Sequence, residues 1–103
     1  MSTRQDTVDF ILENLAALDV SARKMFGEYA LYCEGKVAAF VCDDTLFVKI
    51  LPENSELAQG LETGQAYPGS KPYYVVPGDR IEDPRWLQEL IQITARAVPS
   101  KRK

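Results

Sequence analysis

Lys49 is the residue whose expected neighbours could make its side chain chemically reactive. It ends the run Thr45 to Lys49, TLFVK, and strand alternation would put it on the same side as Phe47. A lysine desolvated beside aromatic rings has a lowered pKa, and its neutral amine can act as a nucleophile. More often the lysine stem packs on the rings while the ammonium group reaches water. We favour that structural role. The alternative is a small-ligand or enzymatic pocket near Lys49, Tyr73 and Tyr74.

Other chemistry is restricted by the absence of histidine from the sequence. This absence excludes Ser-His-Asp and Cys-His catalysis, histidine metal sites and the usual general base near neutral pH. Two cysteines are too few for a thiolate zinc site, and they are too far apart for a C-x-x-C motif. The loop from Gly64 to Lys71 does not match a phosphate-binding loop, because Pro72 follows where a helix would begin. We therefore expect no catalytic residue, no cofactor and no metal.

The composition indicates one small globular domain covering residues 1–103. The chain is 46% hydrophobic and 26% charged, which suits one core rather than two. No apolar run approaches the roughly 20 residues that span a bilayer, and the N-terminus lacks the apolar region of a signal peptide. A cytoplasmic protein without membrane contact is therefore expected. The net charge of −3 disfavours binding of nucleic acid by this domain alone.

The apolar pattern predicts an α+β fold in which an antiparallel sheet packs against N- and C-terminal helices. Asp83 and Pro84 are a strong helix start, with Asp as N-cap and Pro at the first helical position. The period of the apolar residues distinguishes helices from strands elsewhere. The expected elements are a helix over 3–18, a three-strand meander within 23–50, a short helix over 52–61, a strand over 73–76, and a helix from 83 to 98.

The register of the meander follows from two expected turns, Glu34-Gly35 and Asp43-Asp44. They place Tyr32 opposite Val37, Ala30 opposite Ala39, Val41 opposite Leu46, and Ala39 opposite Val48. One face then carries Ala30, Tyr32, Val37, Ala39, Val41, Leu46, Val48 and Ile50, and would pack against the helices.

The opposite face is expected to set Tyr29, Phe40 and Phe47 in one cross-strand row. A row this apolar should not lie open to water in a small monomer. It must be covered by a helix, by the C-terminal half of the chain, or by a second copy, and a homodimer is the favoured prediction. Cys33 and Cys42 would lie at opposite ends of this face, roughly 20 Å apart along a strand. A disulfide needs Cα atoms within about 7 Å, so both thiols should be free.

The run Arg23 to Tyr32, RKMFGEYALY, resembles the opening motif of the TfoX (Sxy) N-terminal domain family, which is approximately R-x-M-F-G-x-Y-G-[IL]-Y. Ala30 departs from this motif, since the family favours Gly there. The similarity covers nearly the whole chain. It continues through Gly35-Lys36, the Asp44 turn, Leu46 to Lys49, Tyr73 to Pro77, and Asp83-Pro84.

The resemblance implies a two-layer α/β fold and a link to regulators of bacterial competence genes, which are thought to act as co-activators through protein contacts. The expected function is thus a non-enzymatic regulatory or protein-interaction domain. Its partner is an unidentified protein, with the transcription machinery as one candidate, or a second copy. Direct DNA binding is a third reading that needs a basic stripe. The candidate partner-binding residues are Arg23, Tyr29, Phe40, Phe47 and Lys49.

Overall fold

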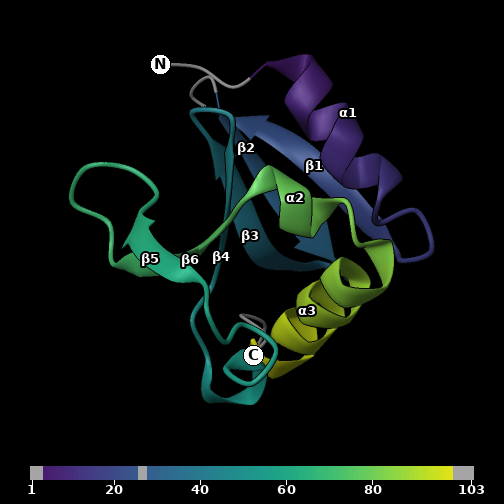
Figure 1. Ribbon diagram of the computed structural model, residues 1–103. Coiled ribbons are helices and arrows are strands. Elements are labelled where there is room, and N and C mark those ends of the chain that lie inside the picture. The colour runs from purple at the N-terminus through teal and green to yellow at the C-terminus, as the bar shows by residue number, and fades with distance from the viewer. Residues whose placement is uncertain (1–3, 26–27, 99–103) are drawn as a thin grey trace.

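A computed structural model describes residues 4–25 and 28–98. One sheet of six antiparallel strands, in the order β1-β2-β3-β4-β6-β5, has its helices gathered on one side (Figure 1). This is the expected α+β arrangement. The elements are α1 (Gln5–Glu13), β1 (Val20–Met25), β2 (Glu28–Cys33), β3 (Lys36–Cys42), β4 (Thr45–Val48), the 3-10 turn η1 (Pro52–Asn54), β5 (Glu62–Gln65), β6 (Pro72–Val76), α2 (Gly78–Ile81) and α3 (Pro84–Ala97).

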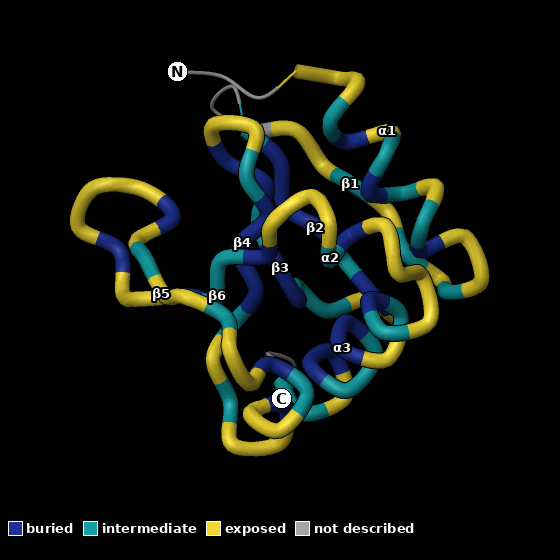
Figure 2. Tube along the Cα trace, viewed as in Figure 1, coloured by how far each residue is buried: buried dark blue, intermediate teal, exposed yellow. Residues whose placement is uncertain are grey.

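The main core lies between the sheet and helices α1 and α3. Strand residues of the meander and the inner stripe of α3 are buried together, as the dark blue segments of Figure 2 show. The start of α3 is the predicted one: Pro84 is its first residue, and the carboxylate of Asp83 accepts a hydrogen bond of 3.3 Å from the backbone N–H of Trp86. The fully buried stripe of this helix is Leu87, Leu90, Ile91, Thr94 and Ala95.

Two segments differ from the expected elements at the N-terminal side. Helix α1 ends at Glu13 rather than at residue 18, although Leu15 is still buried in the turn that follows. The helical spacing of apolar residues thus extends beyond the last residue of the helix itself. Strand β1 was not predicted as a separate strand. Because it is an edge strand that pairs only with β2, Ser21, Arg23 and Lys24 lie exposed and weaken its alternation.

The segment after the meander also differs from the prediction. The expected helix over 52–61 is only the 3-10 turn η1, followed by further turns. Strand β5 lies partly in the stretch that was expected to be a loop, and it pairs with β6. Glu62, Thr63 and Gln65 are exposed on this short edge strand, so no apolar pattern marks it. We call β5, β6 and the loop 66–71 between them the β5–β6 arm.

A β-bulge changes the predicted register between β2 and β3. The pairs Tyr32 with Val37, Val41 with Leu46, and Ala39 with Val48 are as expected. The predicted pair of Ala30 with Ala39 is wrong. Leu31 pairs with Ala39, and Ala30 with Phe40, because Ala38 is an extra residue on β3.

The bulge exchanges the faces of β2 relative to β3 and β4. Tyr29 and Leu31 therefore join Ala39 and Val41 against the helices, and the predicted row of three aromatic residues is broken. Cys33 lies in the main core, whereas Cys42 belongs to a cluster on the opposite face. Both cysteines are buried and free, as predicted, but they do not share a face.

In the part of the chain that the structure describes, no helix is long and apolar enough to cross a membrane.

Candidate functional site

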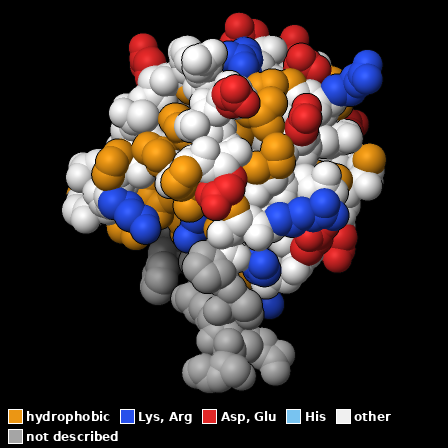
Figure 3. Space-filling model, turned by 90° about the horizontal axis from the view of Figure 1, so that it is seen from below, with side chains coloured by type: hydrophobic (Ala, Val, Ile, Leu, Met, Phe, Trp, Pro, Cys, Tyr) orange, Lys and Arg blue, Asp and Glu red, His pale blue; other side chains and the backbone are white. Residues whose placement is uncertain are grey.

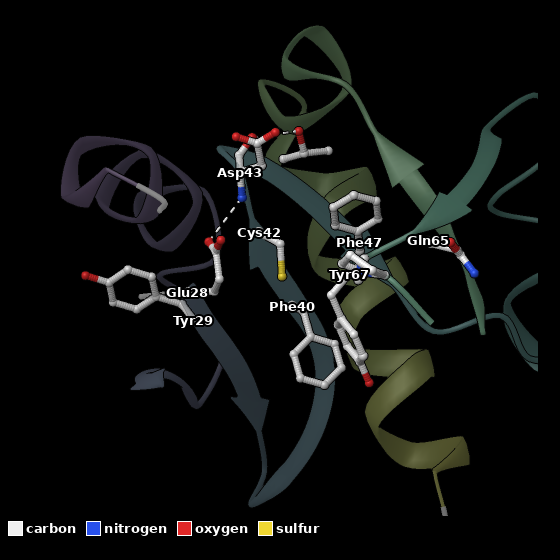
Figure 4. A pocket seen from close by; sticks show the side chains of 11 residues that line it. Glu28, Tyr29, Phe40, Cys42, Asp43, Phe47, Gln65 and Tyr67 are labelled. Atoms are coloured by element: carbon white, nitrogen blue, oxygen red, sulfur yellow. Dashed lines mark hydrogen bonds between the residues drawn. The ribbon is translucent and has the colours of Figure 1, made fainter. Parts of the chain in front are cut away.

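A groove lies on the sheet face that the helices leave uncovered, beside the β5–β6 arm. Its volume is about 950 Å³. We call it the aromatic groove, and Figure 4 shows the side chains around it. The lining residues come from β2, β3, β4, the β3–β4 turn and the arm: Glu28, Tyr29, Phe40, Cys42, Asp43, Thr45, Phe47, Gln65, Ala66, Tyr67 and Pro68.

The floor of the groove is a second apolar cluster. Phe40 and Phe47 are a cross-strand pair on β3 and β4. The Phe40 ring meets the ring of Tyr73 edge-on, with 5.7 Å between centroids and 89° between planes. Ala66 and Cys42 are buried in the same cluster. Phe47 is thus only 8% exposed because it is covered by the chain's own arm, while Phe40 stays half-buried at the groove.

One rim of the groove is acidic. The carboxylate of Glu28, on β2, accepts a hydrogen bond of 3.1 Å from the backbone N–H of Asp43, which holds the two residues together (Figure 4). Asp43 and Asp44 both have positive φ, 53° and 59°, as a tight two-residue hairpin turn requires. Burial, reinforced by the charges of Glu28 and Asp43, raises the pKa of the Cys42 thiol on the floor.

The other rim is an ordered loop of the arm. The Ser70 hydroxyl accepts a hydrogen bond of 3.1 Å from the Ala66 N–H and donates one of 2.9 Å to the carbonyl of Lys71. The side-chain amide of Gln65 donates to the carbonyl of Ser70 at 2.8 Å. These bonds fix the loop in a compact shape, so that Tyr67 is held at the groove although 52% of it is exposed.

The structure brings some of the predicted partner-binding residues together and separates others. Phe40 and Phe47 lie on the groove floor. Tyr29 touches the groove, but its ring points toward α1 and its hydroxyl donates to the Gln5 side chain at 3.0 Å (Figure 4). Arg23 lies away on the edge strand β1, with its guanidinium 5.3 Å from the centre of the Tyr32 ring. Lys49 is half-buried just after the end of β4, and it is not among the described residues that line the groove.

The alternative pocket near Lys49, Tyr73 and Tyr74 is only partly assembled. Lys49 and Tyr73 line a small cavity of about 160 Å³. Tyr74 pairs with Val48 and packs against the main core, on the other face of the sheet. Burial is the main cause of the raised pKa of the Tyr73 phenol, which makes it harder to ionise. These three side chains therefore do not converge on one cavity.

Sequence reasoning missed Tyr67, Glu28 and Asp43 as groove residues. Tyr67 carried a usable signal, because a large aromatic residue in the loop AYPGSKP has no strand or helix to bury it. The role of Glu28 depends on the position of the β3–β4 turn in space, which the sequence does not reveal. The motif residues Phe26 and Gly27, and the side chain of Met25, lie outside the described residues.

Charges of both signs are mixed over the surface seen from below. In Figure 3, Lys and Arg side chains lie among Asp, Glu and hydrophobic side chains, and the described part of this face has no broad basic area. In the described ranges, no group of three His, Cys, Asp or Glu residues could hold a metal ion.

Comparison with known proteins adds two findings. A family model described as the TfoX N-terminal domain matches residues 13–98. A protein of Spirochaeta aurantia, named as an uncharacterized 12.7 kDa protein in the trpE 5′ region, is 36% identical over 101 residues. The match covers 97% of this chain and 87% of that protein.

Proposed function

This chain belongs to the TfoX N-terminal domain family, and on that basis we propose that it is a non-enzymatic regulatory or protein-interaction domain. Its contact surface is the aromatic groove. The observation that carries the proposal is the position of Tyr67, an aromatic side chain 52% exposed on a hydrogen-bonded loop, beside the half-buried Phe40. Aromatic residues at the edge of an apolar depression are the typical anchors of protein interfaces.

Binding fits the chemistry of the groove better than catalysis does. The sequence has no histidine to serve as a general base. Cys42 contributes a thiol to the lining of the groove, and burial together with the charges of Glu28 and Asp43 raises the pKa of this thiol. A cysteine in such surroundings stays protonated, and the thiol is a poor nucleophile.

The regulatory role would be exerted through protein contacts. We propose a cytoplasmic protein partner, with the transcription machinery as one candidate, rather than DNA. The net charge of −3 and the two carboxylates of the groove rim disfavour a phosphate backbone at this surface.

The test is affinity capture from a lysate of the native cell with matched variants. Tyr67→Asp places a charge at the groove, while Gln59→Asp places the same charge in an exposed turn. We expect a partner that is retained by the wild type and by Gln59→Asp and is lost with Tyr67→Asp. Retention of the same partner by a folded Tyr67→Asp protein would show that the groove is not the contact surface.

A further inference from the structure

The charged side chains among the described residues that line the aromatic groove are both acidic. Glu28 and Asp43 form its rim, and none of the described residues that line it is a lysine or arginine. The remaining polar lining groups, Thr45 and Gln65, are neutral. Asp43 is exposed at the turn and Glu28 is half-buried beside it, and an acidic rim of this kind attracts positive charge. A ligand that fills the groove therefore gains most when it brings a positive charge to this rim.

The rest of the lining also suits a cation attached to an apolar stem. Phe40 and Tyr67 contribute partly exposed aromatic rings, and the faces of such rings attract Lys and Arg side chains. Ala66 and Pro68 add apolar surface, along which a long aliphatic stem can pack. The groove thus offers aromatic rings for the body of a ligand and carboxylates for its charged end.

We propose that the groove binds a basic, apolar peptide segment, with Lys or Arg directed to the Glu28–Asp43 rim and a large apolar side chain on the Phe40 floor. This inference rests on the proposed function and specifies the chemistry of the partner. A second copy is a less suitable occupant. A symmetric contact would place the same acidic rim on both sides, and each chain already has a net charge of −3.

The test uses three labelled synthetic peptides of equal length, observed by fluorescence anisotropy. The first alternates Arg with Leu and Phe, the second replaces each Arg by Glu, and the third replaces each Leu and Phe by Ser. We expect the first to bind at least about tenfold more tightly than the other two. Its affinity should fall as salt is raised. Equal binding of all three, or a preference for the acidic peptide, would overturn the inference.

The rim is tested with Asp43→Asn against Asp79→Asn. Asparagine tolerates positive φ about as well as aspartate, so the first variant removes a charge and keeps the turn. Asp79 is exposed in the first turn of α2, outside the set of groove residues. Asp43→Asn should weaken binding of the basic peptide by about two- to fivefold, while Asp79→Asn should leave it unchanged. Equal affinity of the two variants would contradict the role of the rim.

The two cysteines report where the peptide binds. Cys42 lines the groove, and Cys33 lies in the main core on the other face. Bound basic peptide should slow the alkylation of Cys42 and leave that of Cys33 unchanged. Protection of Cys42 that grows with protein concentration alone would identify a second copy as the occupant. Binding of free arginine amide as tightly as the peptide would identify a small-cation site. Either result would overturn the inference.

The failure of the basic-peptide proposal can be distinguished from the failure of the proposed function. If capture gives a partner that depends on Tyr67 while the acidic peptide binds better, the proposed function stands and the inference fails. If no variant in the groove affects capture, the proposed function fails independently of the peptide results.

Discussion

Asp44 supplies the side-chain acceptor that the N-cap residue of α1 lacks. Arg4, at the N-cap position, makes no side-chain cap bond. Instead the Asp44 carboxylate, from the β3–β4 turn, accepts bonds of 2.9 Å from both the Arg4 N–H and the Thr7 hydroxyl. The hydrogen bond from the Arg4 backbone is the largest cause that lowers the pKa of Asp44 below its usual value, and the hydrogen bond from Thr7 lowers it further. A residue far away in sequence thus satisfies donors at the start of a helix.

This arrangement predicts a pH-dependent effect of Asp44→Asn. Because the folded state lowers the pKa of the carboxyl, its contribution is present above the pKa of the unfolded chain and is lost as pH falls through the folded pKa. The wild type should therefore unfold at higher urea than Asp44→Asn near neutral pH, and the gap should close in acid. Urea midpoints at several pH values measure this. Glu56→Gln, an exposed change in a turn, is the control. A gap that persists unchanged in acid would rule out the charge as its cause.

The thiols of Cys33 and Cys42 are predicted to be free but slow to react. Burial is the largest cause of the raised pKa of each, so little thiolate exists near neutral pH. Titration of the unfolded, unreduced protein should count both thiols. In the native state Cys42 should react before Cys33, because it lies at the groove. A count near zero after unfolding would indicate a disulfide, and equal native rates would contradict the separation of the two faces.

Asn54 joins the 3-10 turn η1 to helix α3. Its side-chain N–H groups donate to the Lys49 carbonyl at 2.9 Å and to the Thr94 hydroxyl at 2.8 Å. Its side-chain oxygen accepts from the Leu51 N–H at 3.2 Å. Asn54 is fully buried, so these bonds replace water completely.

Asn54→Ala should therefore lower the free energy of unfolding by about 2 kcal/mol, because it leaves buried partners unsatisfied. Ser55→Ala is the matched control. Ser55 is exposed and donates only to the Pro52 carbonyl, and its loss should cost less than about 0.5 kcal/mol. Urea denaturation of the two variants measures the difference. Similar costs for both would mean that the buried network contributes little.

The sequence predicts an element well when the residues that cause it are neighbours in the chain. The start of α3 needs only Asp83 and Pro84, so it was predicted correctly. The bulge at Ala38 has no local cause in the sequence, and it determines which face Tyr29 occupies. In contrast, the pairing of Phe40 with Phe47 depends only on the β3–β4 turn, which is local, so the sequence predicts it correctly. Glu28 and Tyr67 reach the groove through tertiary placement, which no periodicity encodes.

The charge distribution of the protein predicts that it does not bind DNA specifically. The chain has a net charge of −3, and its groove rim is acidic. Neutralising phosphates requires a concentrated basic surface. In a gel-shift assay at physiological salt, we expect no shift that distinguishes one duplex sequence from its scrambled version. A salt-sensitive shift with one sequence only would contradict this prediction.

A homodimer stays a prediction from the sequence, and the structure changes which residues would form it. Tyr29 and Phe47 are each 8% exposed within the single chain. The more exposed aromatic residues on this face are Phe40 and Tyr67, and we expect a dimer at this face to contact them. Phe47→Glu would place a charge in a buried cluster and should unfold the domain. If the wild type sediments as a dimer, Tyr67→Asp should give a folded monomer. A stable Tyr67→Asp dimer would place the contact elsewhere.

The strand order also has a consequence for the route by which the chain folds. Strands β1 to β4 pair in sequence order, so their ladders close through short loops at low entropic cost. Strand β6 then bypasses β5 to pair with β4, which requires the longer connection through η1 and β5. Since sequence-local contacts form faster than distant ones, we expect the four-strand meander to assemble first. The β5–β6 hairpin would dock late. The groove between the meander and this hairpin should therefore be among the last parts of the molecule to form.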